Sequence, residues 1–279
     1  MTLPYLDKIT CKHGIFDILK QDRYVCKSLI EYGEWCEGEV DLYKDIIQSN
    51  DIIIEVGSHI GTHAIPLAKI AKEGFIYCFE PQRLMFDLLK KNIQQNNISN
   101  CEINFMAVSN KEMILKIKEL EYEKYFQTPN YTVNSGGADF RQLITHKDEG
   151  YDIALIKLDN KFKNLQKLDF IKIDAEGNEL DVLHGSKELI NKFQPIIYFE
   201  FEPEQNLVTQ EILKFLDPLG YSFYYHITPM FNFNNHKNNK ENYFSELKSY
   251  MFLCIHNKKI NSSLEEKLNK NNAIKNVKN

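Results

Sequence analysis

The stretch "DIIIEVGSHIGTHAIPLAK" (residues 51–69) decides the fold of this chain. Three branched apolar residues lead into Glu55, and Gly57 and Gly61 follow before a segment with helical spacing. Continuous apolar runs are typical of parallel strands that are covered on both faces. A strand, a glycine loop and a helix N-terminus suit a nucleotide-like ligand, which can approach the backbone where side chains are missing. The stretch therefore predicts a first strand and its ligand-binding loop.

Strands and helices alternate after this stretch. Expected strands lie at 75–80, 101–108, 168–174, 195–201, 221–227 and 250–256. Expected helices lie at 62–74, 82–97, 178–193 and 207–220, the first of them ending on Gly74 as its C′ residue. This alternation predicts an α/β fold with a doubly wound parallel sheet and a ligand at the carboxyl ends of the strands.

The domain boundaries follow from where the alternation starts and stops. Residues 1–50 form an N-terminal extension with a helix around residues 40–49, and residues 51–257 form the main domain. The rhythm breaks at about 108–166, which we interpret as an insertion carrying one or two hairpins. Residues 258–279 are a polar tail, expected to be a solvated helix or disordered chain.

Composition excludes several classes of protein. The formal net charge of −5 argues against nucleic-acid binding, which needs a basic face. The six cysteines include no CxxC pair, a pattern that favours reduced thiols over a disulfide framework or a zinc site. No apolar segment approaches the ~20 residues of a membrane span, and no signal peptide is apparent. We expect a cytoplasmic protein without a membrane span or a nucleic-acid partner.

Two carboxylates and the glycine spacing select the cofactor. Glu80 ends the second strand of the series, where it could accept hydrogen bonds from both ribose hydroxyls. A dinucleotide site would show G-x-G-x-x-G, but His59 stands where the second glycine belongs, and Glu55 would repel a phosphate. S-adenosyl-L-methionine has an ammonium and a sulfonium group and no phosphate, so it fits better. The predicted cofactor-binding residues are Glu55, Gly57, Ser58, His59, Gly61, Glu80 and Asp174.

The chain resembles the FkbM family, a branch of the class I S-adenosylmethionine-dependent methyltransferases. The segments that carry the resemblance are "IIEVGSHIGTHAIPLAK", "YCFEPQ", "AVSNKE", "LDFIKIDAEGNELDVLHGS", "PIIYFEF" and "YYHITPMFNFNNHKNNKENYF". The resemblance implies a Rossmann-like, seven-stranded, mostly parallel sheet whose last strand is antiparallel. It also implies O-methyl transfer to a hydroxyl of a sugar, glycan or small metabolite. The chain departs from the family at His59, where Asn is more common, and at Asn160, where a second Asp is more common.

Three carboxylates crowd the end of the fourth parallel strand, at Asp174, Glu176 and Glu179. One interpretation is that the two glutamates cap the following helix and complement its dipole. The other is that Asp174 borders the methionine end of the cofactor while a neighbour orients or deprotonates the acceptor hydroxyl. With Glu200 and Glu202 the cluster could instead hold a divalent cation, but we expect no metal requirement.

His226 is the other candidate for the catalytic base. It is expected at the end of a strand, before an Asn- and Phe-rich loop that opens over the site, and the family's "WH…P" segment supports this role. Asn232 and Asn235 could then bind a polar acceptor, with Phe231 and Phe233 lining its pocket. The resemblance places Glu34 and Trp35 on a lid near the active site, and Glu200 completes the predicted substrate-binding set. His63 is expected to shape the cofactor loop and helix.

Three rival functions remain at this stage. An NAD-dependent oxidoreductase is disfavoured by the glycine spacing, and a nucleic-acid methyltransferase would show a D/N-P-P-Y-like motif where "DAEG" stands. A non-catalytic binding module on the same fold is the third. The sequence leaves the oligomeric state open, a homodimer included.

Overall fold

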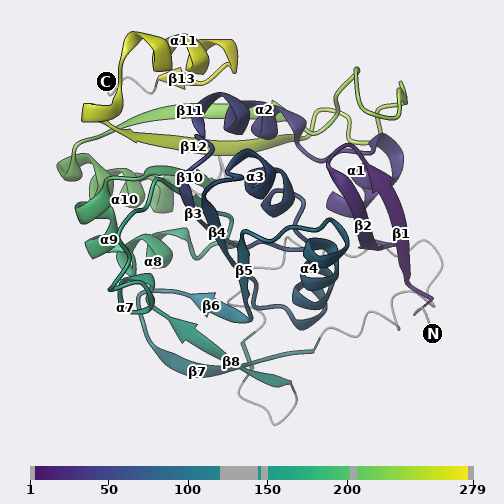
Figure 1. Cartoon of the computed structure of the whole chain (residues 1–279), viewed down its shortest axis with the longest axis horizontal. Coiled ribbons are helices and arrows are strands. Elements are labelled where there is room, and N and C mark those ends of the chain that lie inside the picture. The colour runs from purple at the N-terminus through teal and green to yellow at the C-terminus, as the bar shows by residue number, and fades with distance from the viewer. Residues whose placement is uncertain (1–3, 120–143, 146–149, 202–205, 276–279) are drawn as a thin grey trace.

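A single large sheet organises the molecule (Figure 1). The computed structural model describes residues 4–119, 144–145, 150–201 and 206–275. Within them the sheet has eight strands in the order β13-β11-β12-β10-β9-β3-β4-β5. Their bounds are β3 Ile52–Val56, β4 Phe75–Phe79, β5 Cys101–Asn104, β9 Phe170–Ile173, β10 Ile196–Glu200, β11 Tyr221–Pro229, β12 Lys248–His256 and β13 Ile274–Lys275.

Strand directions confirm the expected topology. β3, β4, β5, β9 and β10 pair in parallel, and β12 is antiparallel to both of its neighbours, β10 and β11. The seven expected strands are therefore present with the last one reversed. β13 adds a short eighth strand at the edge, antiparallel to β11.

Helices cover both faces of the sheet, as a doubly wound fold requires. One core contains α2 Glu37–Ile46, α3 Ala64–Ile70 and α4 Arg83–Gln95. The other contains α7 Leu158–Lys161, α8 Glu179–His184, α9 Lys187–Phe193 and α10 Asn206–Leu216. Neighbouring strand residues alternate between the cores, with Ile53 facing the first and Ile54 the second. Among the described residues, no helix combines the length and the apolar character that a membrane crossing requires.

Several expected boundaries are wrong. The strand expected at 101–108 is split, because β6 Met106–Val108 leaves the main sheet and pairs with β8 Tyr151–Ile156. β7 Met113–Ile117 joins β8 from the other side, so the insertion carries a three-stranded sheet. Its turn-rich part, residues 131–140, lies outside the described residues.

Gly74 does not cap α3, which ends at Ile70. A Cβ on Gly74 would lie 1.9 Å from the carbonyl oxygen of Asp51. The glycine is therefore explained by a close approach of two backbone segments.

The N-terminal extension contains more regular structure than the sequence indicated. β1 Leu6–Cys11 and β2 Gly14–Leu19 form a hairpin that packs against α4, and α1 Val25–Tyr32 precedes α2. The side-chain oxygen of Asn96 on the α4 cap accepts from Ile15 N at 2.9 Å, and that of Asn92 accepts from Asp17 N at 2.6 Å. The hairpin is thereby fixed to the main domain.

The polar tail folds back onto the domain. α11 Ser262–Lys270 packs against α2, and the Lys270 ammonium lies 2.8 Å from the Asp45 carboxylate. Leu268, only 1% exposed, joins the core that contains α2 and α3. The described part of the tail, residues 258–275, thus contains the expected helix, but that helix contributes to the core instead of being wholly solvated.

Replacing Leu268 with Ala should destabilise the protein by about 2–5 kcal/mol, because a buried side chain is lost and a cavity remains. Thermal melting should show a fall in Tm of several degrees. Leu207→Ala is the matched control, since Leu207 is 78% exposed and its loss should change stability by less than about 0.5 kcal/mol. Equal melting temperatures for Leu268→Ala and the parent would show that the tail is not part of the folded core.

Candidate functional site

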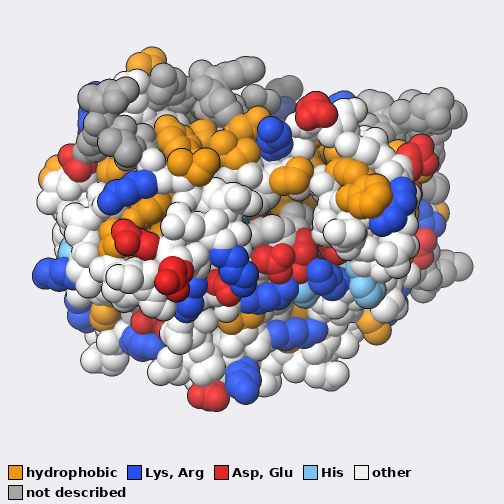
Figure 2. Space-filling view, turned by 90° about the horizontal axis from the view of Figure 1, so that it is seen from above, with side chains coloured by type: hydrophobic (Ala, Val, Ile, Leu, Met, Phe, Trp, Pro, Cys, Tyr) orange, Lys and Arg blue, Asp and Glu red, His pale blue; other side chains and the backbone are white. Residues whose placement is uncertain are grey.

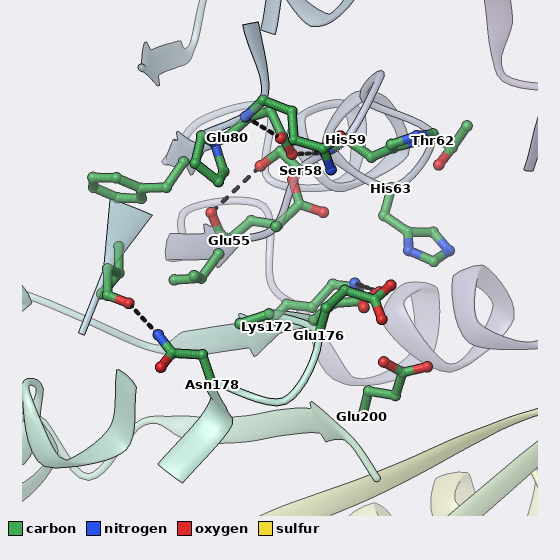
Figure 3. A pocket seen from close by; sticks show the side chains of 18 of the residues that line it. Glu55, Ser58, His59, Thr62, His63, Glu80, Lys172, Glu176, Asn178 and Glu200 are labelled. Carbon is green, nitrogen blue, oxygen red and sulfur yellow. Dashed lines mark hydrogen bonds and ion pairs between the residues drawn. The ribbon is translucent and has the colours of Figure 1, made fainter. Parts of the chain in front are cut away.

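A cavity of about 320 Å³ opens at the carboxyl ends of β3, β4 and β9 (Figure 3). Its walls include nine of the residues that the sequence predicted for the site. These are Trp35, Glu55, Gly57, Ser58, His59, Glu80, Asp174, Glu176 and Glu200. The cavity therefore lies at the carboxyl ends of the parallel strands, where the sequence predicted a ligand.

Gly57 brings two strand ends into contact. It has a φ of +82°, and a Cβ there would lie 1.8 Å from the carbonyl oxygen of Asp174. Gly61 serves a different purpose, because it does not line the cavity and a Cβ on it would meet Leu89 of α4 at 2.9 Å. The missing side chain of Gly57 is thus explained by the contact between the two strand ends, and its backbone also lines the cavity.

Two backbone N–H groups hold the Glu80 carboxylate in place. Its oxygens accept from His59 N and Gln82 N, each at 2.8 Å, and the residue is only 3% exposed. The pKa of Glu80 is raised to about 7, chiefly by burial; the two N–H bonds act to lower it, and the Asp174 and Glu55 carboxylates act to raise it. The carboxylate is fixed in place and titrates near neutrality.

Lys172 is the main residue that the sequence analysis missed. It is only 1% exposed, and its ammonium lies 2.9 Å from the Asp174 carboxylate. Burial alone would lower the pKa of Lys172, but Asp174, Glu55 and Glu39 together raise it. The available signal was the single positive charge inside the buried strand "FIKI". A charge in such a run calls for a buried partner.

Asp174 and Glu200 form a coupled pair. Burial raises the pKa of Glu200 well above its usual range, and the nearby Asp174 and Glu176 carboxylates raise it further. Burial also acts to raise the pKa of Asp174, but Lys172 outweighs it and the net shift is downward. The proton of the pair therefore resides on Glu200, and Asp174 carries the charge.

Asp174, Glu176 and Glu200 each offer a carboxylate oxygen, and these atoms lie within 4.8 Å of one another. This spacing is compatible with a divalent cation. Lys172 already neutralises part of the same charge.

Glu179 shapes the turn rather than lining the main cavity. One of its oxygens accepts from Ala175 N at 3.0 Å and from Gly177 N at 3.1 Å. These bonds hold the turn in which Glu176 adopts a positive φ of 50°. Glu176 therefore lines the cavity, and Glu179 supports the turn that carries Glu176.

The prediction that His226 overhangs the site on a loop is wrong. His226 lies inside β11, is only 1% exposed, and does not line the cavity. Its Nδ1 lies 2.7 Å from the Tyr198 hydroxyl, and burial lowers its pKa to about 4. The strand continues to Pro229, two residues further than expected and three beyond His226, so the imidazole belongs to the core.

The residues predicted to bind the acceptor divide into two groups. Trp35 lines the cavity, with Tyr24, Val25 and Met230 beside it. Glu34, Asn232 and Asn235 instead hold the loop between β11 and β12, a role that the sequence did not reveal.

Glu34 is the centre of that loop's attachment. It is only 3% exposed, and its oxygens accept from Asn232 Nδ2 at 2.7 Å and from His236 N at 2.9 Å. Asn235 donates to the carbonyls of Asn232 and Asn239. The side chains of Glu34 and Asn235 thus form hydrogen bonds that hold the loop, and they do not line the cavity.

The cavity fits the expected S-adenosylmethionine. Glu80 lines the cavity, is only 3% exposed and is held by the N–H groups of His59 and Gln82, which suits a partner of the ribose hydroxyls. Glu55 and Asp174 supply negative charge for an ammonium group. Asn178, whose side chain donates to the Val108 carbonyl at 2.8 Å, closes the wall next to Met106 and Ala107.

Comparisons with known proteins give a family match that covers most of the main domain. A family model described as the Methyltransferase FkbM domain matches residues 55–223, more than half of the chain. A protein of Methanosphaera stadtmanae named "Probable ribosomal RNA small subunit methyltransferase A" is 32% identical over 89 residues, 32% of this chain and 30% of that protein. "Methyltransferase 1" of Beauveria bassiana is 23% identical over 152 residues, 49% of this chain and 58% of that protein. The chain thus spans less than two thirds of either relative.

Solved structures similar to this chain include that of a methyltransferase FkbM from Methylobacillus flagellatus, with 14% sequence identity and a TM-score of 0.45. That match covers 74% of this chain and 44% of the other. A precorrin-6y C5,15-methyltransferase from Geobacter metallireducens matches at 10% identity and a TM-score of 0.44, covering 78% and 87%.

The pKa of Glu80 yields a pH-dependent prediction. A ribose hydroxyl donates to the ionised carboxylate, so binding should strengthen as pH rises through about 7 and level off above it. Calorimetry with 5′-methylthioadenosine, which has the ribose but no amino-acid tail, should show this rise between pH 6 and pH 8. In Glu80→Gln the affinity should be lower and the pH dependence absent, with a loss of about 1.5–3 kcal/mol. An unchanged affinity in the variant would remove Glu80 from the site.

Proposed function

This chain belongs to the FkbM methyltransferase family, and we propose that it methylates a hydroxyl oxygen of a sugar or similarly polar small molecule. It is a methyltransferase, and its methyl donor is S-adenosylmethionine. When bound, that cofactor supplies an electrophilic methyl group on a sulfonium. Family membership removes the NAD-dependent oxidoreductase as an alternative.

The Asp174–Glu200 pair carries the proposal. A hydroxyl is a poor nucleophile, and a positioned base assists as its proton becomes acidic during transfer. Glu200 has a raised pKa, so its ionised form is a stronger base than an ordinary carboxylate. Asp174, kept ionised by Lys172, orients the hydroxyl and stabilises the proton on Glu200. Glu200 takes the place of His226 as the proposed base, because His226 is buried and does not line the cavity.

The cavity wall supports a polar acceptor with an apolar face. The lining includes the apolar and aromatic side chains of Trp35, Tyr24, Val25 and Met230 as well as the hydrogen-bonding carboxyl groups of Glu176 and Glu200. A sugar ring presents both kinds of surface, with C–H groups for an aromatic ring and hydroxyls for carboxylates.

The charges around the cavity argue against a nucleic-acid acceptor. Among the described residues of its lining, Lys172 and two histidines are the basic side chains, and Lys172 is already paired with Asp174. A phosphate backbone would meet five acidic residues there. On the face shown in Figure 2, Lys and Arg side chains are interspersed with Asp and Glu side chains. Polyanion binding requires a concentrated positive surface.

The acceptor class is tested by mass spectrometry. The protein and S-adenosylmethionine are incubated with a panel of methyl glycosides and, separately, with total RNA, with EDTA present or absent. We expect a mass gain of one CH₂ on a glycoside, none on RNA, and no effect of EDTA. Methylation of RNA alone would contradict the proposal, and loss of activity with EDTA would indicate a cation among the three carboxylates.

Glu200→Gln tests the base. It should lower turnover roughly 10²–10⁴-fold and leave the affinity for S-adenosylhomocysteine nearly unchanged. Glu211→Gln, the same change at an exposed position on α10, is the matched control. The turnover of the parent should rise with pH beyond the usual carboxyl range, because burial raises the pKa of Glu200. Normal turnover in Glu200→Gln would transfer the role to another group.

A further inference from the structure

His63 is a buried cavity residue that the proposed reaction does not use. It is 5% exposed, lines the cavity and immediately precedes α3. Its ring stands edge-on to Tyr43, with centroids 5.7 Å apart at 90°. Figure 3 shows it on the side of the view that holds Glu176 and Glu200, opposite Asn178. The ring is fixed in position beside the acidic part of the cavity.

The Nε2 atom of His63 is buried and has no hydrogen-bond partner among the described residues. A carboxylate oxygen of Glu39 lies 4.0 Å from Nε2, beyond hydrogen-bonding distance. Glu39 is itself buried and accepts from the hydroxyls of Tyr43 at 3.0 Å and Ser249 at 2.6 Å. A buried polar atom without a partner calls for an explanation. Protonation of the ring on ligand binding would let Nε2 donate to Glu39 and would supply the missing partner.

The charged residues that line the cavity suit one end group of the cofactor's tail and not the other. The lining contains five acidic residues, Glu55, Glu80, Asp174, Glu176 and Glu200. Lys172 is committed to Asp174 and also faces Glu55 and Glu39. The amino-acid tail of S-adenosylmethionine has an ammonium, which the acidic groups suit, and a carboxylate, which they repel.

We propose that His63 binds the carboxylate of the cofactor's amino-acid tail, as an imidazolium supported from behind by Glu39. One ring nitrogen donates to the tail, and Nε2 donates to Glu39 after a small closing movement. Ser58 and Thr62 are other donors in the lining, but neither can carry a positive charge. Of the two histidines there, His59 and His63, it is His63 that has the Glu39 carboxylate 4.0 Å from its Nε2. This assignment concerns the methyl donor alone and does not depend on the acceptor.

The surroundings of His63 make its protonation depend on the ligand. Burial lowers the pKa of His63 well below its usual value; Lys172 and His13 lower it further, and Asp174 and Glu37 act in the opposite direction. Glu39 lies 4.0 Å from Nε2. The free imidazole is therefore neutral at pH 7. A carboxylate placed beside it raises the pKa, so binding of the tail is accompanied by proton uptake and strengthens as pH falls.

The test compares two ligands that differ only in the carboxylate. Calorimetry is performed with S-adenosylhomocysteine and with its decarboxylated analogue, which keeps the ammonium and the ribose. The parent should prefer S-adenosylhomocysteine on the order of 10- to 100-fold, and His63→Ala should lose most of that preference. His184→Ala, which removes an imidazole of α8 outside the cavity, is the control and should keep it. Equal weakening of both ligands in His63→Ala, or a preserved preference, would overturn the assignment.

Proton uptake provides an independent readout. Titrations in two buffers of different ionisation enthalpy should show that S-adenosylhomocysteine takes up more protons than the decarboxylated ligand. The contribution of Glu80 cancels, because both ligands have the same ribose. His63→Gln preserves a neutral donor of similar size, so it serves if His63→Ala fails to fold, and it should abolish the difference in uptake. The same uptake for both ligands in the parent would contradict the proposal.

Discussion

The ion pair between the buried Lys172 and the half-buried Asp174 is the interaction on which the site depends. Lys172 lies inside a central strand, is 1% exposed, and faces Glu39 and Glu55 as well as Asp174. Isolated buried charges are strongly destabilising. One central cation makes it possible to keep several carboxylates at the strand ends, and it decides which of them is ionised. Asp174 remains charged beside it, and the proton moves to Glu200.

The backbone around this pair is arranged to let the carboxylates converge. Gly57 permits β3 to touch the carbonyl of Asp174, and Glu179 holds the turn that presents Glu176. Glu80 is aimed by the N–H groups of His59 and Gln82. The lining thus contains carboxylates that suit a ribose and an ammonium, and it also contains apolar residues and the Asp174–Glu200 pair. This combination is consistent with a methyl donor and a polar acceptor in one cavity.

The sequence predicted the sheet and the strand-end carboxylates, because each follows from a local pattern. Glu55, Glu80 and Asp174 come directly after apolar runs, and parallel strands bring such ends together. His226, Asn232 and Asn235 were misplaced because their surroundings depend on long-range contacts. β11 extends past His226, and Glu34, almost two hundred residues earlier in the chain, engages Asn232. Lys172 and His63 were undervalued because a lone charge or imidazole shows its importance only once its partners, from α2 in particular, are known.

The most direct test of the account is a double-mutant cycle on the central pair, with Lys172→Met, Asp174→Asn and the double variant. Unfolding free energy and affinity for S-adenosylhomocysteine are measured for each. We expect each single change to cost about 3–5 kcal/mol of stability, because a buried charge loses its partner, and the double change to cost clearly less than their sum. Lys172→Met should also weaken S-adenosylhomocysteine binding, because the carboxylates it organises become protonated. A Lys172→Met protein as stable as the parent, with unchanged affinity and additive effects in the cycle, would contradict the account.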